Sequence, residues 1–248
     1  MTWSIVARDP ESGDLGIAVA SRFFAVGSRV PHLCSHVGAV ATQAFVNPHY
    51  GIHGLVMLAE GKSPEEIVAS LTAADEGRDS RQLHMIDARG RSAAFTGSAC
   101  VDWAGHLLDD QVSVAGNMLA GPAVIEETLK SYQAHPELPL LERLLGAMEA
   151  GEAAGGDKRG KQSAAVQVYR GEAYPWLDLR ADDHADPLAE LRRLYAVAQE
   201  RYLHFAEAIP TAANPSGLTD RTELDKKLQA LEEEQQKSGY RSASFANP

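Results

Sequence analysis

The chain opens on Trp3–Arg8, with the sequence WSIVAR, in which apolar residues alternate with polar or small ones. The turn-forming cluster Asp9–Asp14, DPESGD, follows, and Leu15–Ser21, LGIAVAS, is a second apolar run. Two short runs on either side of such a cluster are typical of a β-hairpin. We therefore expect the fold to start with two antiparallel strands, with residue 2 at the start of the first.

The rest of the chain carries strands in adjacent groups and helices in pairs. Ser63-Pro64-Glu65-Glu66, for example, supplies a helix N-cap, a proline at the first helical position and a glutamate at the third. This order differs from strict β-α-β alternation and favours an antiparallel, layered α+β architecture. The predicted strands are 30–35, 37–43, 82–87, 92–96, 111–115, 163–169 and 174–179, and the predicted helices are 50–60, 121–133 and 187–208, with two more that begin at residues 64 and 139.

Composition limits the class of protein. The 248 residues include 23 Lys and Arg and 34 Asp and Glu, which gives a net charge of −11. An acidic chain is a poor match for nucleic acids and anionic membranes. No apolar run reaches the ~20 residues that a membrane span needs, and no basic segment leads into an apolar one at the N-terminus. We expect a cytoplasmic protein with neither nucleic-acid nor membrane partners.

The composition changes after Pro210. Residues 219–236 are highly charged with few apolar positions, a pattern typical of a surface helix. Polar chain ends are commonly disordered, and we expect disorder from about residue 237 onward. We predict one folded domain over residues 1–210 and a charged C-terminal tail over residues 211–248.

The N-terminal dipeptide Met1-Thr2 indicates a chemical role for the second residue. Removal of an initiator methionine requires a small second residue, and threonine is small enough. Removal would place a hydroxyl and a free α-amine on one residue. An α-amine has a pKa of about 7.7–8.0, so it can take the hydroxyl proton near neutral pH and activate Thr2 as a nucleophile. The alternative is a threonine with no catalytic role.

Stretches spread over residues 2–208 carry a family resemblance. They are 2–9, 18–24, 41–43 with Asn47-Pro48, 116–121, 155–162 and 178–184. The first hairpin resembles that of the N-terminal nucleophile (Ntn) hydrolases, and the chain as a whole is similar to the DUF1028 proteins in that superfamily. The resemblance implies a four-layer αββα sandwich, with two antiparallel sheets between helical layers. It implies no known substrate.

The early basic residues differ from those of the proteasome-like Ntn enzymes. Those enzymes place a lysine on an early strand, where it lowers the pKa of the nucleophilic site, whereas the first lysine here is Lys62. Arg22 and Arg29 are the side chains with permanent positive charge between the first strand and Lys62. Either can supply positive potential, but arginine cannot accept a proton. The base is therefore expected to be the α-amine of Thr2 or a histidine.

Acyl transfer also needs hydrogen-bond donors for the oxyanion. Asn117 follows Gly116 at the end of a predicted strand, and Asn47 precedes Pro48 where the chain leaves another. Because site residues gather at such ends, we assign both as candidate oxyanion donors and Gln43 as a residue that orients them. The alternatives are asparagines that cap a turn or helix and a buried glutamine bonded to the backbone.

A glycine-framed charged loop, Gly155-Gly156-Asp157-Lys158-Arg159-Gly160, lies before the next strand. Such a loop can hold an anion with backbone amides and cationic side chains. Lys158 and Arg159 are therefore candidates for binding a substrate carboxylate, with Asp157 as a positioning residue. We add Asp178 as a fourth candidate for substrate binding. The alternative is a solvated helix terminus.

Three functions stay open. The leading hypothesis is a hydrolase of a small amide, such as an N-acyl or N-carbamoyl amino acid or a short peptide, with Thr2 as nucleophile. The second is a non-catalytic protein of the same fold that binds a metabolite or serves in an assembly. The third is a metal-dependent hydrolase that uses Asp182, Asp183 and His184, although a cap for the helix at Asp186-Pro187 is the preferred reading of that cluster. We predict no metal or other cofactor, a small-molecule substrate and a homodimer.

Overall fold

The computed structural model describes residues 2–246. Met1, whose removal the sequence predicts, lies outside the described residues, as do residues 247–248 of the predicted disordered end. Contacts divide the chain into two units, of which the first ends at Leu191 and the second begins at Arg192. The division falls earlier in the chain than the boundary predicted at residue 210.

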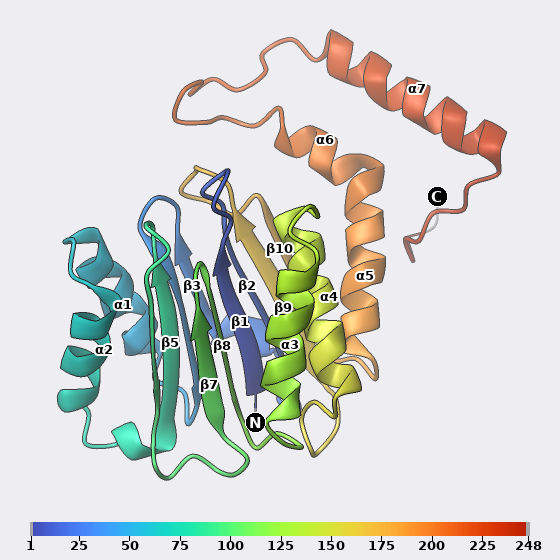
Figure 1. The fold of residues 1–248 in the computed structure, drawn as a ribbon. Coiled ribbons are helices and arrows are strands. Elements are labelled where there is room, and N and C mark those ends of the chain that lie inside the picture. The colour runs from blue at the N-terminus through green and yellow to red at the C-terminus, as the bar shows by residue number, and fades with distance from the viewer. Residues whose placement is uncertain (1, 247–248) are drawn as a thin grey trace. The chain divides into compact units, whose positions relative to one another are not determined.

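The first unit contains two antiparallel sheets (Figure 1). Sheet A has the strand order β10-β9-β2-β1-β8-β7, and sheet B has the order β3-β4-β5-β6. The strands of sheet A are β1 (Thr2–Arg8), β2 (Leu15–Ser21), β7 (Gly105–Asp109), β8 (Val112–Asn117), β9 (Ser163–Tyr169) and β10 (Leu177–Ala181). Those of sheet B are β3 (Pro31–Cys34), β4 (Gly38–Ala44), β5 (Arg81–Asp87) and β6 (Ser92–Thr96).

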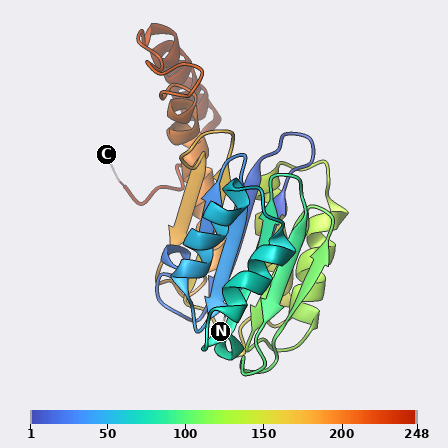
Figure 2. The same cartoon turned by 90° about the vertical axis from the view of Figure 1, so that its left-hand side faces the viewer.

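A pair of helices covers the outer face of each sheet. Helices α1 (Pro48–Ala59) and α2 (Pro64–Ala73) pack on sheet B, and Figure 2 shows them in front of its strands. Helices α3 (Ala123–Ala134) and α4 (Leu140–Ala153) pack on sheet A. The inner faces of the two sheets contact each other. The predicted layered α+β sandwich, with two antiparallel sheets between helical layers, is confirmed.

The alternation of residues in β1 follows from this layering. Because successive side chains of a strand point to opposite faces, Ser4 and Val6 face sheet B, whereas Trp3 faces α4, where Gly151 leaves room for its indole. Apolar residues from both sheets fill the space between them on the Val6 side. This inter-sheet core consists of Val6, Leu15, Ile17, Val19, Val26, Val30, Leu33, Ala39, Ala41, Ile86 and Ala165.

Two strands differ from the prediction for local reasons. β7 (Gly105–Asp109) was not expected, because it is a short strand at the edge of sheet A whose sequence, GHLLD, lacks alternation. β10 begins at Leu177, later than the predicted residue 174, and Pro175 has no N–H to contribute to a ladder. Two 3-10 turns, η1 (Val26–Ser28) and η2 (Arg78–Ser80), complete the first unit.

The second unit is helical. The helix α5 (Pro187–Val197) begins before the division at Leu191 and continues through the π-helical turn η3 (Ala198–Tyr202) into α6 (Leu203–Ala206), within the helix predicted over 187–208. The bounds of α7 (Thr222–Ser238) differ by no more than three residues from those of the surface helix predicted over 219–236. Gly239 follows it as the C-cap, with a φ of 69° that suits this position. Across the described residues, none of the helices is long and apolar enough to cross a membrane.

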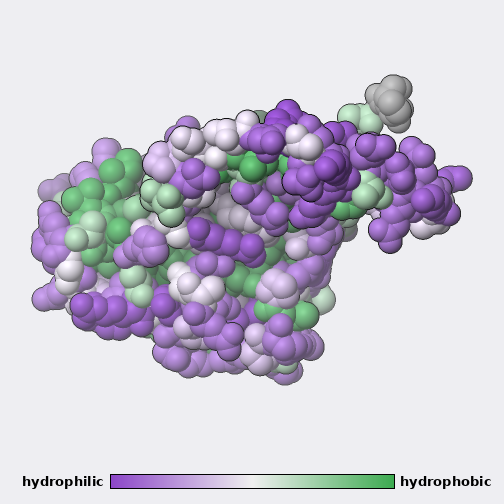
Figure 3. Space-filling view, turned by 90° about the horizontal axis from the view of Figure 1, so that it is seen from above, coloured by the Kyte–Doolittle hydropathy of each residue, from purple (hydrophilic) through white to green (hydrophobic). Residues whose placement is uncertain are grey.

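Apolar side chains also reach the surface of the α1–α2 layer. Ile52 and Val56, one turn apart on α1, are 50% and 53% exposed. Figure 3 shows apolar side chains gathered on this side of the molecule, whereas polar ones dominate most of the face in view. Exposed apolar patches are common at protein interfaces. The homodimer stays a prediction, and this layer is a surface on which to test it.

Candidate active site

Thr2 lies at the end of the inter-sheet space, at the start of the central strand β1. Its two neighbours across sheet A are Ser21 of β2 and Asn117 of β8. The Thr2 hydroxyl donates a hydrogen bond to Ser21 Oγ at 3.1 Å, and the residue is only 6% exposed. Pairing in sheet A therefore places a candidate nucleophile between two polar side chains, Ser21 and Asn117, that are far apart in the sequence.

A buried polar network lies behind Thr2, between the two sheets. Asn117 Nδ2 donates to the Thr2 carbonyl at 3.3 Å and to Gln82 Oε1 at 3.0 Å. Gln43 Nε2 donates to the same Gln82 oxygen at 2.8 Å and to the Ala115 carbonyl at 3.2 Å. Gln82 and Gln43 come from sheet B and Asn117 from sheet A. The network thus fixes the separation of the two sheets where Thr2 lies.

Backbone carbonyls determine how the amides in this network point. Gln82 Nε2 donates to the carbonyls of Gly116 at 2.8 Å and Gly105 at 3.0 Å, so Gln82 Oε1 must be the acceptor for its other partners. Asn117 consequently uses both of its amide hydrogens, one on Gln82 and one on Thr2. It presents no free donor, and its contribution to the site is to hold the Thr2 backbone in place.

The network continues to a buried histidine that sequence analysis did not single out. Ser4 Oγ donates to Gln43 Oε1 at 2.7 Å, so it accepts from His84 Nε2 at 2.8 Å. His84 Nδ1 then accepts from Ser113 Oγ at 2.9 Å. Burial, and secondarily the nearby His106 ring, lower the pKa of His84 to about 3, against a raising effect of the Ser113 backbone. The imidazole is therefore neutral and serves as a relay of hydrogen bonds.

His84 makes the fold sensitive to mild acid. The unfolded chain binds a proton near the ordinary pKa of 6.5, whereas the folded chain does not until about pH 3. Because the unfolded state then binds more protons, stability present above pH 6.5 is lost as the pH falls. We expect the free energy of unfolding, from urea titrations, to drop by about 2 kcal/mol between pH 7 and pH 5. His84→Gln should remove most of this dependence; an equally steep pH profile in that variant would contradict the assignment.

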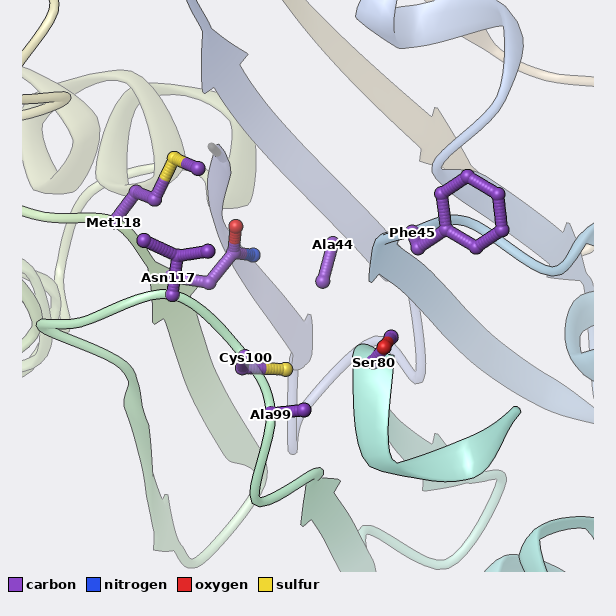
Figure 4. Close-up of a pocket in the computed structure, with 8 residues that line it drawn as sticks. Ala44, Phe45, Ser80, Ala99, Cys100, Asn117 and Met118 are labelled. Atoms are coloured by element: carbon purple, nitrogen blue, oxygen red, sulfur yellow. The ribbon is translucent and has the colours of Figure 1, made fainter. Parts of the chain in front are cut away.

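A pocket of about 510 Å³ opens beside Asn117. Its lining comes from the end of β4 and the residue after it, from η2, from the segment before β7, and from the end of β8 and the residue after it. Figure 4 shows these side chains around the pocket. Ala44 and Met118 both line it, each directly after a network residue and each with positive φ, 67° and 55°. The pocket is lined by Ala44, Phe45, Ser80, Ala99, Cys100, Val101, Asn117 and Met118.

The glycine-framed loop crosses the start of β1. Asp157 pairs with Leu119 beyond β8 in an isolated bridge, and its carboxylate accepts from the backbone N–H of Arg22, beyond β2, at 2.8 Å. The same carboxylate, 1% exposed, also accepts from the backbone and guanidinium of Arg159. The loop therefore joins the two strands that flank Thr2. Asp157 and Arg159 are engaged with each other.

Loss of the Asp157 carboxylate should release this loop. In Asp157→Asn one oxygen becomes a donor that faces another donor, which costs about 1–3 kcal/mol. We expect trypsin to cleave after Arg159 about tenfold faster, since a local opening easier by about 1.4 kcal/mol is ten times more populated. Asp178→Asn, which also removes a carboxylate bonded to an arginine, is the matched control and should leave cleavage at Arg159 unchanged. Equal rates in wild type and Asp157→Asn would contradict the anchoring role.

Two cationic side chains at this end bond only to backbone oxygens. Arg22 Nη1 donates to the Arg159 carbonyl at 2.7 Å, and Lys158 Nζ donates to the Asp102 carbonyl at 2.6 Å. Within residues 2–246, neither forms an ion pair with a carboxylate. Both are exposed. They supply positive potential on either side of Thr2.

Asn47 and Asp178 lie apart from Thr2. Asn47 is the N-cap of α1, where its side chain accepts from His49 N and donates to Asp75 at 3.2 Å. Asp178 lies on β10 and accepts hydrogen bonds from Gln167 and Arg180. Two strands, β9 and β2, lie between β10 and β1. At about 4.8 Å per strand, that places β10 roughly 14 Å from β1. The structure thus brings together Thr2, Asn117, Gln43, Arg22 and the 157–159 loop, and leaves these two outside.

The polar cluster after β10 forms no metal site. Asp183 accepts from Gln162 at 3.1 Å, and His184 Nδ1 accepts from the Asp186 backbone N–H at 3.0 Å, next to the start of α5. Through the part of the chain that the structure describes, no group of three His, Cys, Asp or Glu side chains is placed to hold a metal ion. The metal-dependent alternative therefore has no ligand set here.

Comparisons with known proteins agree with this fold. The model of a family of unknown function, DUF1028, matches residues 2–191. The crystal structure of protein SPO2555 from Silicibacter pomeroyi, described with the same family, is 34% identical. The match covers 88% of this chain and 99% of that chain, with a TM-score of 0.82. The search of curated proteins found no match.

Proposed function

Because the chain belongs to the DUF1028 family, whose function is unknown, we propose an activity from the site itself: Thr2 is the N-terminal nucleophile of an amidohydrolase. The observation that carries the proposal is the placement of the Thr2 hydroxyl. It is bonded to Ser21 at the start of β1, and its other neighbour across sheet A, Asn117, lines a pocket. Cleavage of the Met1–Thr2 bond would add a free α-amine to the same residue.

The proposed reaction has two steps, acylation of Thr2 and hydrolysis of the acyl-enzyme. In the first, Thr2 Oγ1 attacks the amide carbon, the α-amine takes the hydroxyl proton and passes it to the leaving nitrogen, and the C–N bond breaks. In the second, water attacks the resulting ester with the α-amine again as base, which releases a carboxylic acid and restores Thr2. Ser21 orients the hydroxyl before attack, since its Oγ accepts the hydroxyl hydrogen bond.

Asn117, Gln43 and Gln82 act as positioning residues. Asn117 donates to the Thr2 carbonyl, and Gln82 Oε1 accepts from both Asn117 and Gln43, so the three together hold the direction of the Thr2 side chain. A nucleophile misplaced by about 1 Å can cost on the order of 100-fold in rate. Arg22 and Lys158 are proposed to attract a small amide that carries a carboxylate, such as an N-acyl amino acid or a short peptide.

The N-terminal state and the hydrolysis of amides test the proposal together. Intact-mass measurement should show Thr2 as the first residue, and the protein should release amine from members of a panel of N-acyl and N-carbamoyl amino acids and dipeptides. Blocking the α-amine by mild carbamylation at neutral pH should stop turnover, because the base is lost. Turnover by protein in which Met1 is fully retained would refute the proposal.

A further inference from the structure

We propose that the pocket beside Asn117 takes an uncharged, apolar group of the amide substrate. This inference rests on the proposed function, since it assigns the substrate class for the Thr2 site. The residues that line the pocket are uncharged and mostly apolar. None of those eight residues carries a formal charge, and Phe45, Val101, Cys100 and Met118 supply most of the large side chains.

The side chains that line the pocket offer a charged ligand no opposite charge, and Ser80 supplies a hydroxyl. Both amide hydrogens of Asn117 are used within the network. The Cys100 thiol donates to the Arg81 carbonyl at 3.2 Å, and burial raises its pKa, so the thiol stays neutral. A charge placed here would lose its hydration without gaining an oppositely charged partner in the lining. An aliphatic or aromatic group would lose nothing.

Two exposed apolar side chains also line the pocket. Phe45 is 72% exposed and Val101 is 51% exposed. Each square ångström of such surface that a ligand covers contributes roughly 25 cal/mol. The volume, about 510 Å³, lies within the ordinary range for small-molecule sites, about 300–1,000 Å³.

Charged groups gather instead on the other side of Thr2. A second pocket, of about 320 Å³, is lined by Arg22, Lys161, Gln162, Asp183, His184 and Ala185. It begins one residue beyond Ser21, whereas the first pocket begins at Asn117. Thr2 itself lines neither pocket, but its neighbour Asn117 lines the uncharged one, and Arg22, the residue after its other neighbour Ser21, lines the charged one. A substrate with one apolar end and one polar end matches this arrangement.

Binding of simple amides tests the assignment without requiring turnover. The protein is full-length Thr2→Val, and the probes are butanamide, hexanamide and octanamide, with 7-hydroxyheptanamide as a polar chain of similar length. NMR titration should show the dissociation constant falling by about two- to fourfold per methylene, since a fully buried methylene contributes about 0.8 kcal/mol. The hydroxyl-terminated amide should bind about tenfold more weakly than octanamide.

A pocket-filling variant locates the effect. Ala99 is an exposed alanine that lines the pocket, and Ala73 is an exposed alanine at the end of α2 that does not. Ala99→Phe should weaken octanamide binding about tenfold and butanamide binding less than twofold. Ala73→Phe should change neither.

The outcomes separate this inference from the proposed function. Binding that rises with chain length and is lost in Ala99→Phe supports the inference even if wild type hydrolyses no amide, in which case the nucleophile proposal alone fails. Affinity that is independent of chain length, equal for the hydroxylated probe, or reduced equally by Ala73→Phe overturns the inference, even if wild type hydrolyses amides.

Discussion

Thr2→Val should hydrolyse the best amide substrate at least about a thousandfold more slowly than wild type, because it removes the nucleophile and keeps the β-branched shape. Thr2→Ser should keep measurable activity, since serine retains both the hydroxyl and the α-amine. The hydrogen bond to Ser21 is modest, so the free energy of unfolding should fall by only about 1 kcal/mol in Thr2→Val. The measurement is kcat/KM for each variant after its N-terminus has been verified by intact mass.

Thr128→Val is the matched control for this series. Thr128 is a fully buried threonine on α3 whose hydroxyl bonds to the Val124 carbonyl of its own helix. We expect its activity to stay within about twofold of wild type, because its hydroxyl supports only the helix. If Thr2→Val keeps more than a tenth of the wild-type kcat/KM, Thr2 is not the nucleophile.

Gln82→Leu should destabilise the protein by about 4 kcal/mol. Gln82 is fully buried, and its amide joins two backbone carbonyls, Gln43 and Asn117. Leucine leaves those buried partners unsatisfied, at about 1–3 kcal/mol for each that finds no replacement. Chemical denaturation measures the loss. Since Asn117 would no longer be held, kcat should also fall by at least about tenfold in the folded fraction.

Gln167→Leu is the comparison for this prediction. Gln167 is also a buried glutamine, on β9 of sheet A, but within the described residues its side chain bonds to one partner, the half-exposed Asp178 at 3.1 Å. We expect a loss of no more than about 1.5 kcal/mol and no change in kcat. Equal effects of the two substitutions would mean that the network has no special part in holding Thr2.

The sequence was most informative where local rules and layering agree. The opening hairpin, the capping box at Ser63 and the grouping of strands led to the observed sandwich because each depends on short-range patterns. The nearness of Asn117 to Thr2 could be anticipated because both are strand ends, although only the register Thr2↔Asn117 shows that they are direct neighbours.

Gln82 and His84 were missed because of what their strand resembles. In RQLHMID they alternate with apolar Leu83 and Met85, a pattern that in most antiparallel sheets marks a solvent-facing side. β5 belongs to an inner sheet, so both of its faces are buried. In a four-layer sandwich, polar residues at alternate positions of an inner strand must bond to the facing sheet. That rule would have identified both.

For Asn47, sequence analysis preferred an oxyanion donor over a helix cap, although the local sequence favours the cap. Pro48 is the first residue of α1, so the position before it is an N-cap, and asparagine is among the residues preferred there. In the structure this side chain caps the helix and donates to Asp75.

Asp157 could not have been placed from sequence, because its partners Arg22 and Leu119 are distant in the chain.

The most direct measurement is the mass of an acyl-enzyme. Wild-type protein would be mixed with an activated acyl ester of an apolar acid, quenched in acid and digested, and the N-terminal peptide analysed by tandem mass spectrometry. We predict one acyl group on Thr2 Oγ1, transient in wild type and not formed in Thr2→Val. A peptide that still begins with Met1, or an acyl group formed equally in Thr2→Val, would contradict the assignment of Thr2 as the nucleophile.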